Sequence, residues 1–387
     1  MRSTRLFYIL IVPLLLSNCS YMANVRLLSN GELRKQEFVE VIPFELRKDI
    51  IVIKAYVNDD PTEKEFIFDT GAFNSKLENN LAETLGLPTV TTKKNSTAQG
   101  VTRDIEVTRI DSIRLGNTSF YNIGAGKVVY DKTSASPCVA AHGIIGANLI
   151  KLAHWKIDYQ NEQIYFSDTP FPKVPNRTAY SIPFEKPTLS GTPKITLEIE
   201  GRTVENILFD VGYNGGLVLP DKFKKAFSSK NERIVFDRST SGIYGSNRDT
   251  LTIKDLEVSI GGYSQNMPVE FSAIGKALLG NEFLKSCIVL IDYDQQEITL
   301  QPFKEIHIER AKAFIPGILN DSLWVVNRTS PSFPLKIGDT LKAVNGYMPK
   351  DLFHSHCDYI MNISSLISKD TLAVKTVSDK MVTLVVQ

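Results

Sequence analysis

One short pattern occurs twice in this chain, and it constrains the fold more than any other feature. Residues 66–72 read FIFDTGA and residues 207–213 read ILFDVGY. In each copy an apolar run typical of a buried strand leads into one aspartate, and a glycine follows two residues later. Such a chain folds most simply as two related lobes that each present one aspartate at a turn.

The repeat extends well beyond these motifs. Solenoid repeats have much shorter periods, so each copy has the size of a whole lobe. We therefore expect two homologous lobes, at residues 37–172 and 173–305, related by an approximate twofold axis. The paired landmarks keep one order, at separations of 141, 145 and 134 residues: Asp69 with Asp210, Gly100 with Gly245, and Gly146 with Gly280.

Each copy also contains a short amphipathic helix after its aspartate turn. The first helix is expected to run from near Glu78 to Gly86, and Pro220 and Asp221 are expected to open its counterpart. Most of the remaining sequence in both copies reads as strands joined by turns.

Two aspartates that meet across a twofold axis have a definite chemistry. Carboxylates within a hydrogen bond of each other cannot both ionise cheaply, so they share one proton and titrate as a unit. The ionised member can take a proton from a water molecule while the protonated member polarises a carbonyl group. We find no Gly-x-Ser-x-Gly motif to suggest a serine nucleophile instead.

Residues of about 45 to 303 resemble a single-chain, two-lobed aspartic protease of the retropepsin-like kind. The resemblance rests on the motif at residues 69–72, its weaker partner at 210–212, and the apolar-apolar-glycine elements at 144–146 and 278–280. It implies a mostly β fold with two homologous β-barrel lobes, a peptide or protein substrate, and no cofactor. It also implies catalytic roles for Asp69 and Asp210, and active-site loop positions for Thr70, Gly71, Ala72, Val211 and Gly212.

The second copy departs from the family pattern at Val211, where the family has threonine. In the family, each threonine hydroxyl bonds to the opposite loop and holds the two aspartates in place. Thr70 can do this from one side, but valine has no hydroxyl group. Three hypotheses stay open: an aspartic endopeptidase with a one-sided grip, a catalytically weak or inactive peptide-binding protein of the same fold, and a purely structural envelope lipoprotein.

The loops at residues 97–103 and 241–248 fall where such lobes carry flaps. We expect Gly100 and Gly245 to be flap hinges or tips, although an ordinary hairpin turn would explain either glycine alone. Tyr244 is expected to be an exposed flap residue that contacts substrate.

Residues 310–387 follow a different pattern. Residues 335–346 resemble the central strand and turn of a PDZ domain, and a helix at 350–367 and two strands within 372–386 should complete a small α+β domain. PDZ domains bind an extended peptide, usually its C-terminus, at a sheet edge. Residues 316–319 would then be the remnant of a carboxylate-binding loop. A purely structural cap on the second lobe is the alternative.

The N-terminus has the features of an export signal. Two arginines precede an apolar run that is too short to span a bilayer, so residues 1–18 are expected to form a signal peptide. The run ends at Cys19 in a sequence that resembles a bacterial lipobox, except that Asn18 replaces the usual small residue. Lipidation of Cys19 would anchor the chain in a membrane of the cell envelope through a tether at 19–36, and simple secretion is the alternative.

Composition limits the remaining possibilities. A net charge of +1 provides no broad positive field, so nucleic acid is not an expected partner. Three cysteines remain after Cys19, and we expect Cys138, Cys287 and Cys357 to be buried free thiols, with a Cys138–Cys287 bridge as the alternative. The five histidines show no zinc-binding spacing, so no metal site is expected.

Overall fold

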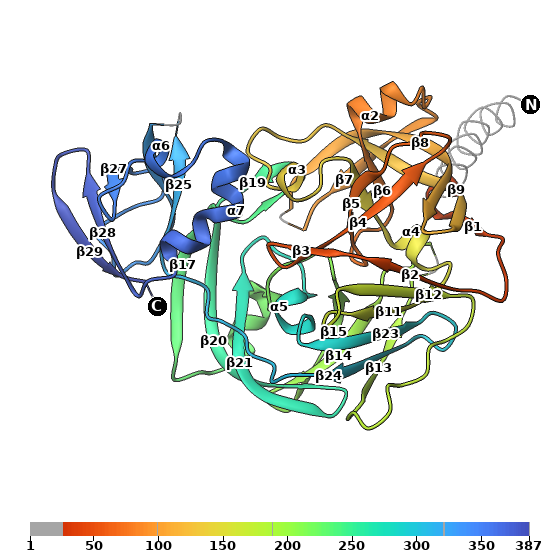
Figure 1. Cartoon of the computed structure of the whole chain (residues 1–387). Coiled ribbons are helices and arrows are strands. Elements are labelled where there is room, and N and C mark those ends of the chain that lie inside the picture. The colour runs from red at the N-terminus through yellow and green to blue at the C-terminus, as the bar shows by residue number, and fades with distance from the viewer. Residues whose placement is uncertain (1–25, 99, 188, 320–321, 387) are drawn as a thin grey trace, which may run out of the picture.

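The computed structural model describes residues 26–98, 100–187, 189–319 and 322–386. The protein is mostly β, as the sequence predicts, with two strand-rich lobes and a smaller α+β unit at the C-terminal end (Figure 1). Cys19 and the expected signal peptide lie outside the described residues. Among the residues that are described, no helix has the length and apolar character needed to cross a membrane.

The strands of the first lobe form a sheet that closes on itself. The ring runs β4-β5-β10-β6-β9-β8, because β8 pairs both with β9 and with β4. The elements of this lobe are β1 (Glu32–Leu33), β3 (Glu45–Arg47), β4 (Ile50–Val57), β5 (Lys64–Phe68), β6 (Ser75–Glu78), α2 (Asn79–Thr84), β7 (Thr91–Ser96), β8 (Thr102–Leu115), β9 (Thr118–Val128), α3 (Ser136–Val139), β10 (Gly143–Ile145) and α4 (Ala147–Ile150).

The second lobe repeats this ring strand for strand. Its order is β14-β15-β22-β16-β21-β20, and the pairing of β14 with β20 closes it. The elements are β13 (Tyr180–Glu185), β14 (Lys194–Ile199), β15 (Arg202–Phe209), β16 (Leu217–Pro220), η1 (Asp221–Ala226), β17 (Glu232–Asp237), β18 (Ser241–Gly242), β19 (Gly245–Ser246), β20 (Asp249–Ile260), β21 (Tyr263–Ser272), β22 (Leu278–Leu279), α5 (Asn281–Leu284), β23 (Cys287–Asp292) and β24 (Glu297–Pro302).

The helices after the aspartate turns differ between the copies. Glu78 accepts hydrogen bonds from the backbone N–H groups of Asn80 and Leu81 and so caps α2, close to the expected position. The counterpart η1 is a 3₁₀-helix, and Pro220 at its N-cap has no side chain that can accept such bonds.

A six-stranded sheet joins the lobes beneath the two rings. Its order is β2-β12-β11-β23-β24-β13, with β2 (Val39–Pro43), β11 (His154–Asp158) and β12 (Gln163–Ser167) contributed by the first copy. At its centre β11 pairs antiparallel with its own repeat β23, Ile157 lying opposite Val289. The approximate twofold axis therefore passes between these two strands.

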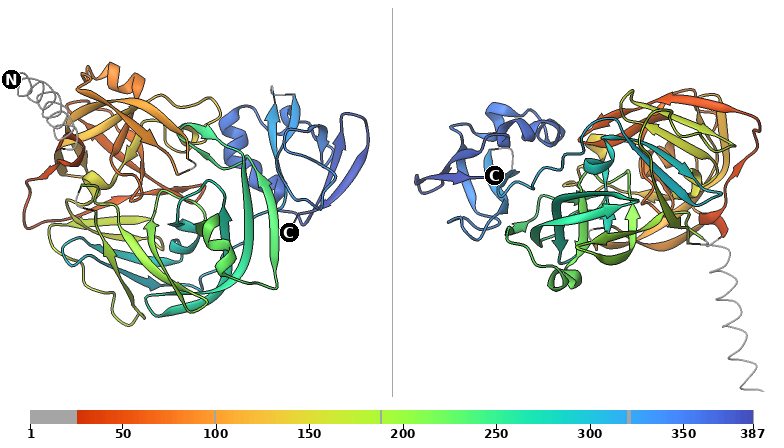
Figure 2. Two further views of the ribbon diagram at one scale, coloured as in Figure 1. Left: turned by 180° about the vertical axis from the view of Figure 1, so that it is seen from behind. Right: turned by 90° about the horizontal axis from the view of Figure 1, so that it is seen from below.

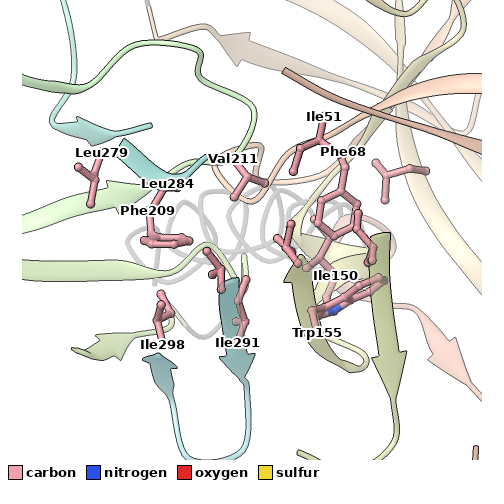
Figure 3. Close-up of a cluster of buried hydrophobic side chains, with 14 of the residues drawn as sticks. Ile51, Phe68, Ile150, Trp155, Phe209, Val211, Leu279, Leu284, Ile291 and Ile298 are labelled. Carbon is pink, nitrogen blue, oxygen red and sulfur yellow. The ribbon is translucent and has the colours of Figure 1, made fainter. Parts of the chain in front are cut away.

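One hydrophobic core runs through both lobes. Figure 3 shows Phe68 and Trp155 from the first copy in the same cluster as Phe209 and Leu284 from the second. Val211 belongs to this cluster and is fully buried. Because the core is continuous across the axis, the aspartate turns that end β5 and β15 rest on a single packed base.

The C-terminal unit has a hydrophobic core of its own around Trp324. Its elements are β25 (Ile315–Leu319), β26 (Leu323–Thr329), β27 (Thr340–Val344), α6 (Pro349–Leu352), α7 (His356–Ile367), β28 (Thr371–Thr376) and β29 (Met381–Val385). The single helix expected at 350–367 is broken in two, because Ser355 caps α7 by accepting a hydrogen bond from the N–H of Asp358 at 3.1 Å. Residues 316–319 lie inside strand β25, so the expectation that they form a loop is wrong.

This C-terminal unit is attached to both lobes, and Figures 1 and 2 show it at one side of the molecule. Strand β26 pairs with β17 of the second lobe. At this junction Arg328 donates to Asp237 at 2.8 Å, and both side chains are buried. On the other side, helix α7 is linked to helix α3 of the first lobe by a disulfide between Cys357 and Cys138.

The disulfide corrects the prediction for the cysteines. Cys138 and Cys357 are neither free nor paired with Cys287, which is a buried free thiol as expected. The bridge forms because α3 and α7, which are far apart in sequence, pack against each other and bring the two Cα atoms within 5.0 Å.

Candidate active site

The two aspartates occupy equivalent positions at the ends of equivalent strands. Asp69 follows β5, and its N–H donates to the carbonyl of Ile145 on the parallel strand β10 at 3.0 Å. Asp210 follows β15, and its N–H donates to the carbonyl of Leu279 on the parallel strand β22, also at 3.0 Å. Ile145 and Leu279 belong to the apolar-apolar-glycine elements of the two copies. These elements therefore fix the backbone positions of the two aspartates.

The structure brings the two carboxyl groups together, and glycine makes this approach possible. A Cβ atom on Gly71 would lie 2.3 Å from a carboxyl oxygen of Asp210, and one on Gly212 would lie 2.3 Å from the carboxyl carbon of Asp69. No side chain fits at either position. Both glycines are thus required for each loop to reach the aspartate of the other lobe.

The carboxyl groups lie close enough for the charge of one to affect the ionisation of the other. Burial raises the pKa of Asp69, although the N–H of Ala72, which donates to its Oδ1 at 2.8 Å, acts in the opposite direction. Burial and the negative charge of Asp69 raise the pKa of Asp210 well above its usual range. One proton is therefore retained between the pair over a wide range of pH.

Thr70 makes the cross-axis hydrogen bonds expected of it, but Val211 makes no matching side-chain bonds in return. Its hydroxyl donates to the carbonyl of Phe209 at 2.6 Å and accepts from the N–H of Val211 at 3.1 Å. Val211 has only methyl groups at the symmetric position, so the reciprocal side-chain bonds cannot form.

Asn281 is a site residue that sequence reasoning missed. Its side-chain amide donates to the carbonyl of Val211 at 2.6 Å and to the carbonyl of Asp49, in the first lobe, at 2.8 Å. The hydroxyl of Tyr159 donates to the Asn281 Oδ1 atom at 2.5 Å and fixes the orientation of this amide. The loop that lacks a threonine is thus tied to the first lobe by an asparagine. The available signal was its position directly after Gly280.

A cleft of about 250 Å³ lies over the dyad. Asp69, Asp210, Ala72 and Tyr213 all line it, so the tyrosine in the second copy narrows the cleft at the position where the first copy has alanine. Both lobes contribute apolar side chains, including Ile67 and Leu278. The mixture of apolar walls and a few polar groups is typical of a peptide-binding or small-molecule site.

The loop of the second lobe closes over this cleft as a small hairpin. Strands β18 and β19 form it, and its Ser241, Gly242 and Ile243 line the cleft. Gly245 has φ +81°, which permits the tight turn at the hairpin. The first lobe contacts this hairpin directly, because the Ser134 hydroxyl donates to the carbonyl of Gly242 at 2.9 Å.

Tyr244 is not the exposed substrate contact that the sequence suggested. Only 4% of its surface is accessible, and its hydroxyl accepts a hydrogen bond from the Asn95 side chain of the first lobe at 2.9 Å. The Arg103 guanidinium lies 4.9 Å from the centre of its ring. The local sequence could not reveal this burial because the covering residues belong to the opposite lobe. Tyr244 therefore holds the hairpin against the first lobe.

The corresponding loop of the first lobe also reaches across the axis. Gly100 is exposed and has φ +75°, and a Cβ atom there would lie 3.6 Å from the carbonyl of Ile274 in the second lobe. Thr97 and Ala98 of this loop line the cleft. Each lobe thus extends one glycine-containing loop toward the other.

Within the described part of the chain, no group of three or more His, Cys, Asp or Glu side chains could hold a metal ion. The geometry described above places two carboxyl groups, one able to act as an acid and the other as a base, beside one cleft. It requires no further group for acid–base chemistry.

Comparison with known proteins agrees with this geometry. Residues 53–149 match the aspartyl protease family. The matched segment contains Asp69 and the Ile144–Gly146 element, and it supports a general aspartic protease function for the domain. Asp210 lies outside the aspartyl protease match, so its equivalence to Asp69 rests on the repeated strand pairing. A search of curated proteins found no match to this chain.

Proposed function

We propose that this protein is an aspartic endopeptidase that uses Asp69 and Asp210 as its dyad. The observation that carries the proposal is the close approach of two aspartates, each at the end of an equivalent strand and both lining one cleft. A water molecule between the carboxyl groups is the nucleophile. The ionised aspartate accepts its proton as the water attacks the scissile carbonyl, and the protonated aspartate donates to the carbonyl oxygen.

The surrounding structure favours this step in two ways. Thr70 and Asn281 hold the second loop in position, which matters because small displacements of catalytic groups reduce rates strongly. The hairpin at β18 and β19 covers the cleft and limits access of bulk water to the bound peptide. Peptide would enter when this hairpin lifts away from the first lobe.

The experiment uses the full chain and a mixed peptide library analysed by mass spectrometry. Wild-type protein should cleave peptides, and Asp69→Asn and Asp210→Asn should each reduce cleavage at least a thousandfold. Asp221→Asn is a matched control, because Asp221 lies on η1 outside the cleft. Equal cleavage by wild type and both dyad variants would refute the proposal.

A peptide-binding protein without turnover is the second candidate, and Val211 favours it. Because the hydroxyl is missing, the side chain of Val211 makes no hydrogen bond to the first lobe, and the second loop is held by the Thr70 hydroxyl and Asn281 from outside it. Retention of library peptides by wild-type protein, without any cleavage product, would select this function over the endopeptidase.

We also propose that the C-terminal unit is a PDZ-like domain whose main role is to hold the lobes together. A peptide added to the free edge of β25 would have to pass between that strand and α7. The Tyr359 hydroxyl of α7 already donates to the carbonyl of Pro316 on β25 at 2.9 Å, which closes this edge. Titration with peptides that end in a free carboxylate tests the role: saturable binding at this domain would show that it also reads peptide C-termini.

For localisation, we propose that the chain is exported and anchored in the cell envelope by lipid on Cys19, with the catalytic lobes outside the cytoplasm. The lipobox-like sequence before Cys19 supports this proposal. Labelling cells with an alkyne fatty acid should tag the wild-type protein, whereas Cys19→Ser should lose the label and become soluble. An equal label on both proteins would refute lipidation at this residue.

A further inference from the structure

Two lysines of the first lobe gather around one asparagine at the edge of the cleft. Lys76, on β6, donates to the Asn74 carbonyl at 2.7 Å and to its side-chain Oδ1 at 3.0 Å. Lys93, on β7, donates to the same Oδ1 atom at 2.7 Å. Two ammonium groups therefore lie close together around a single neutral oxygen.

This arrangement is unusual because Lys76 has no carboxylate at ion-pair distance, although the charge of Asp69 in the dyad acts on it from farther away. Only 5% of Lys76 is exposed, and within the described residues no carboxylate lies within 4.0 Å of its ammonium group or of that of Lys93. The other buried lysines do have partners: Lys127 lies 3.5 Å from Glu106, and Lys254 lies 3.2 Å from Glu232. A buried charge is normally paired, so an unpaired one indicates that its partner comes from a ligand.

The position of Lys76 shows where that ligand would sit. Lys76 and Phe73 line the cleft, and the Lys93 ammonium group lies 5.3 Å from the centre of the Phe73 ring. Lys276 of the second lobe lines the same cleft. Apart from the dyad, the charged side chains that line the cleft are thus both cationic.

The positive charges of the two lysines repel each other. Burial lowers the pKa of Lys76 well below its usual range, and the neighbouring charge of Lys93 lowers it further, whereas the negative charge of Asp69 acts in the opposite direction. Burial also lowers the pKa of Lys93 to about 8. An anion placed between the two ammonium groups would favour their charged forms and would reduce the repulsion between them.

We propose that Lys76 and Lys93 form a subsite that binds a carboxylate of the peptide substrate. The carboxylate is either an Asp or Glu side chain near the scissile bond or the free C-terminus of the peptide. This inference rests on the proposed function for its ligand, because it takes a peptide to be what fills the cleft. It adds a preference for acidic peptides, which the dyad itself does not provide.

The test measures binding, so that it does not depend on turnover. Immobilised Asp210→Asn protein is exposed to random decapeptide libraries, one with free C-termini and one with amidated C-termini, and the retained peptides are identified by mass spectrometry. We expect peptides that carry the recognised carboxylate to be retained at least tenfold better than matched peptides in which an amide replaces it, whether in a side chain or at the C-terminus. A preference for Asp or Glu within the amidated library assigns the subsite to a side chain, whereas better retention of free than of amidated C-termini, without that preference, assigns it to the terminal carboxylate.

Lys76→Met in the Asp210→Asn background should reduce this selectivity at least tenfold, and Lys93→Gln, at a less buried position, should reduce it as well. Lys127→Met removes a buried lysine of the same lobe outside the cleft, and it should leave the selectivity unchanged. The subsite would be overturned if protein with both lysines intact retained Asp/Glu and Asn/Gln peptides equally and also retained free and amidated C-termini equally. Selective retention without cleavage by the wild-type protein would instead overturn the endopeptidase and leave the subsite standing.

Discussion

The hydroxyl of Thr70 accepts the backbone N–H of Val211 across the twofold axis at 3.1 Å, and Val211 has no hydroxyl to return the contact. In a symmetric site a threonine from each lobe would hold the opposite loop. Here two different side chains, Thr70 and Asn281, hold the second loop. Thr70 secures the backbone N–H of the second loop, and Asn281 secures the carbonyl of the same residue.

This asymmetry predicts opposite effects for two substitutions. Thr70→Val leaves the Phe209 carbonyl and the Val211 N–H without their side-chain partner, so it should destabilise the protein by about 1–3 kcal/mol and reduce kcat at least tenfold. Val211→Thr should raise kcat by about threefold to tenfold with KM unchanged, if the missing hydroxyl limits the dyad. Steady-state kinetics and urea unfolding measure both effects. An unchanged rate in Val211→Thr would show that Asn281 already supplies the full constraint.

The coupled carboxyl groups make stability dependent on pH. Because burial raises the pKa of both aspartates in the folded protein, the folded state retains a proton that the unfolded state releases. The dyad therefore costs no stability below the unfolded pKa of about 3.9, and it costs progressively more as the pH rises from there through the folded pKa values. Asp210→Asn removes the part of this cost that comes from Asp210 and from the repulsion between the two carboxylates. Its Tm should exceed that of wild type by a margin that grows from pH 4 to pH 8, and a constant margin would contradict the coupling.

Much of the site could be predicted from sequence because its signals are local and repeated. An apolar strand, an aspartate and a glycine occur together in one short segment, and the second copy shows that they form a pair. The mostly β fold is confirmed for the same reason, since strand and turn patterns are local.

The errors concern contacts made only when distant segments meet. Nothing beside Tyr244 in the sequence shows that Asn95 of the other lobe will cover it. In the same way, the pairing of Cys138 with Cys357 spans 219 residues and depends on how the C-terminal unit docks. Cysteine counts alone leave such pairings undetermined. Asn281 was missed because an asparagine after a glycine is common in sequences and suggests no role by itself. Its role becomes visible only when the assembled lobes place it between two carbonyl groups.

The disulfide should contribute to stability by restricting the unfolded chain. Replacing Cys138 and Cys357 together with serine should reduce the free energy of unfolding by about 2–4 kcal/mol, because the bridge closes a long loop. Cys287→Ala is the matched control, since Cys287 is free and links nothing. Unfolding in guanidinium, with and without a reducing agent, measures the effect. If the reducing agent shifts the serine double variant as much as the wild type, the bridge is not the cause.

The Tyr244 contact predicts how tightly the hairpin covers the cleft. Tyr244→Phe keeps the ring beside Arg103 but removes the hydrogen bond from Asn95. The closed position of the hairpin should therefore become less stable by about 1 kcal/mol. Cleavage of a given peptide should then fall about fivefold in kcat/KM, because less of the enzyme is closed around substrate. The control is Tyr130→Phe in the same apolar cluster, where the hydroxyl is buried without a hydrogen-bond partner within the described residues. Loss of that hydroxyl should not slow cleavage, and equal losses in the two variants would show that the hydrogen bond to Asn95 does not govern closure.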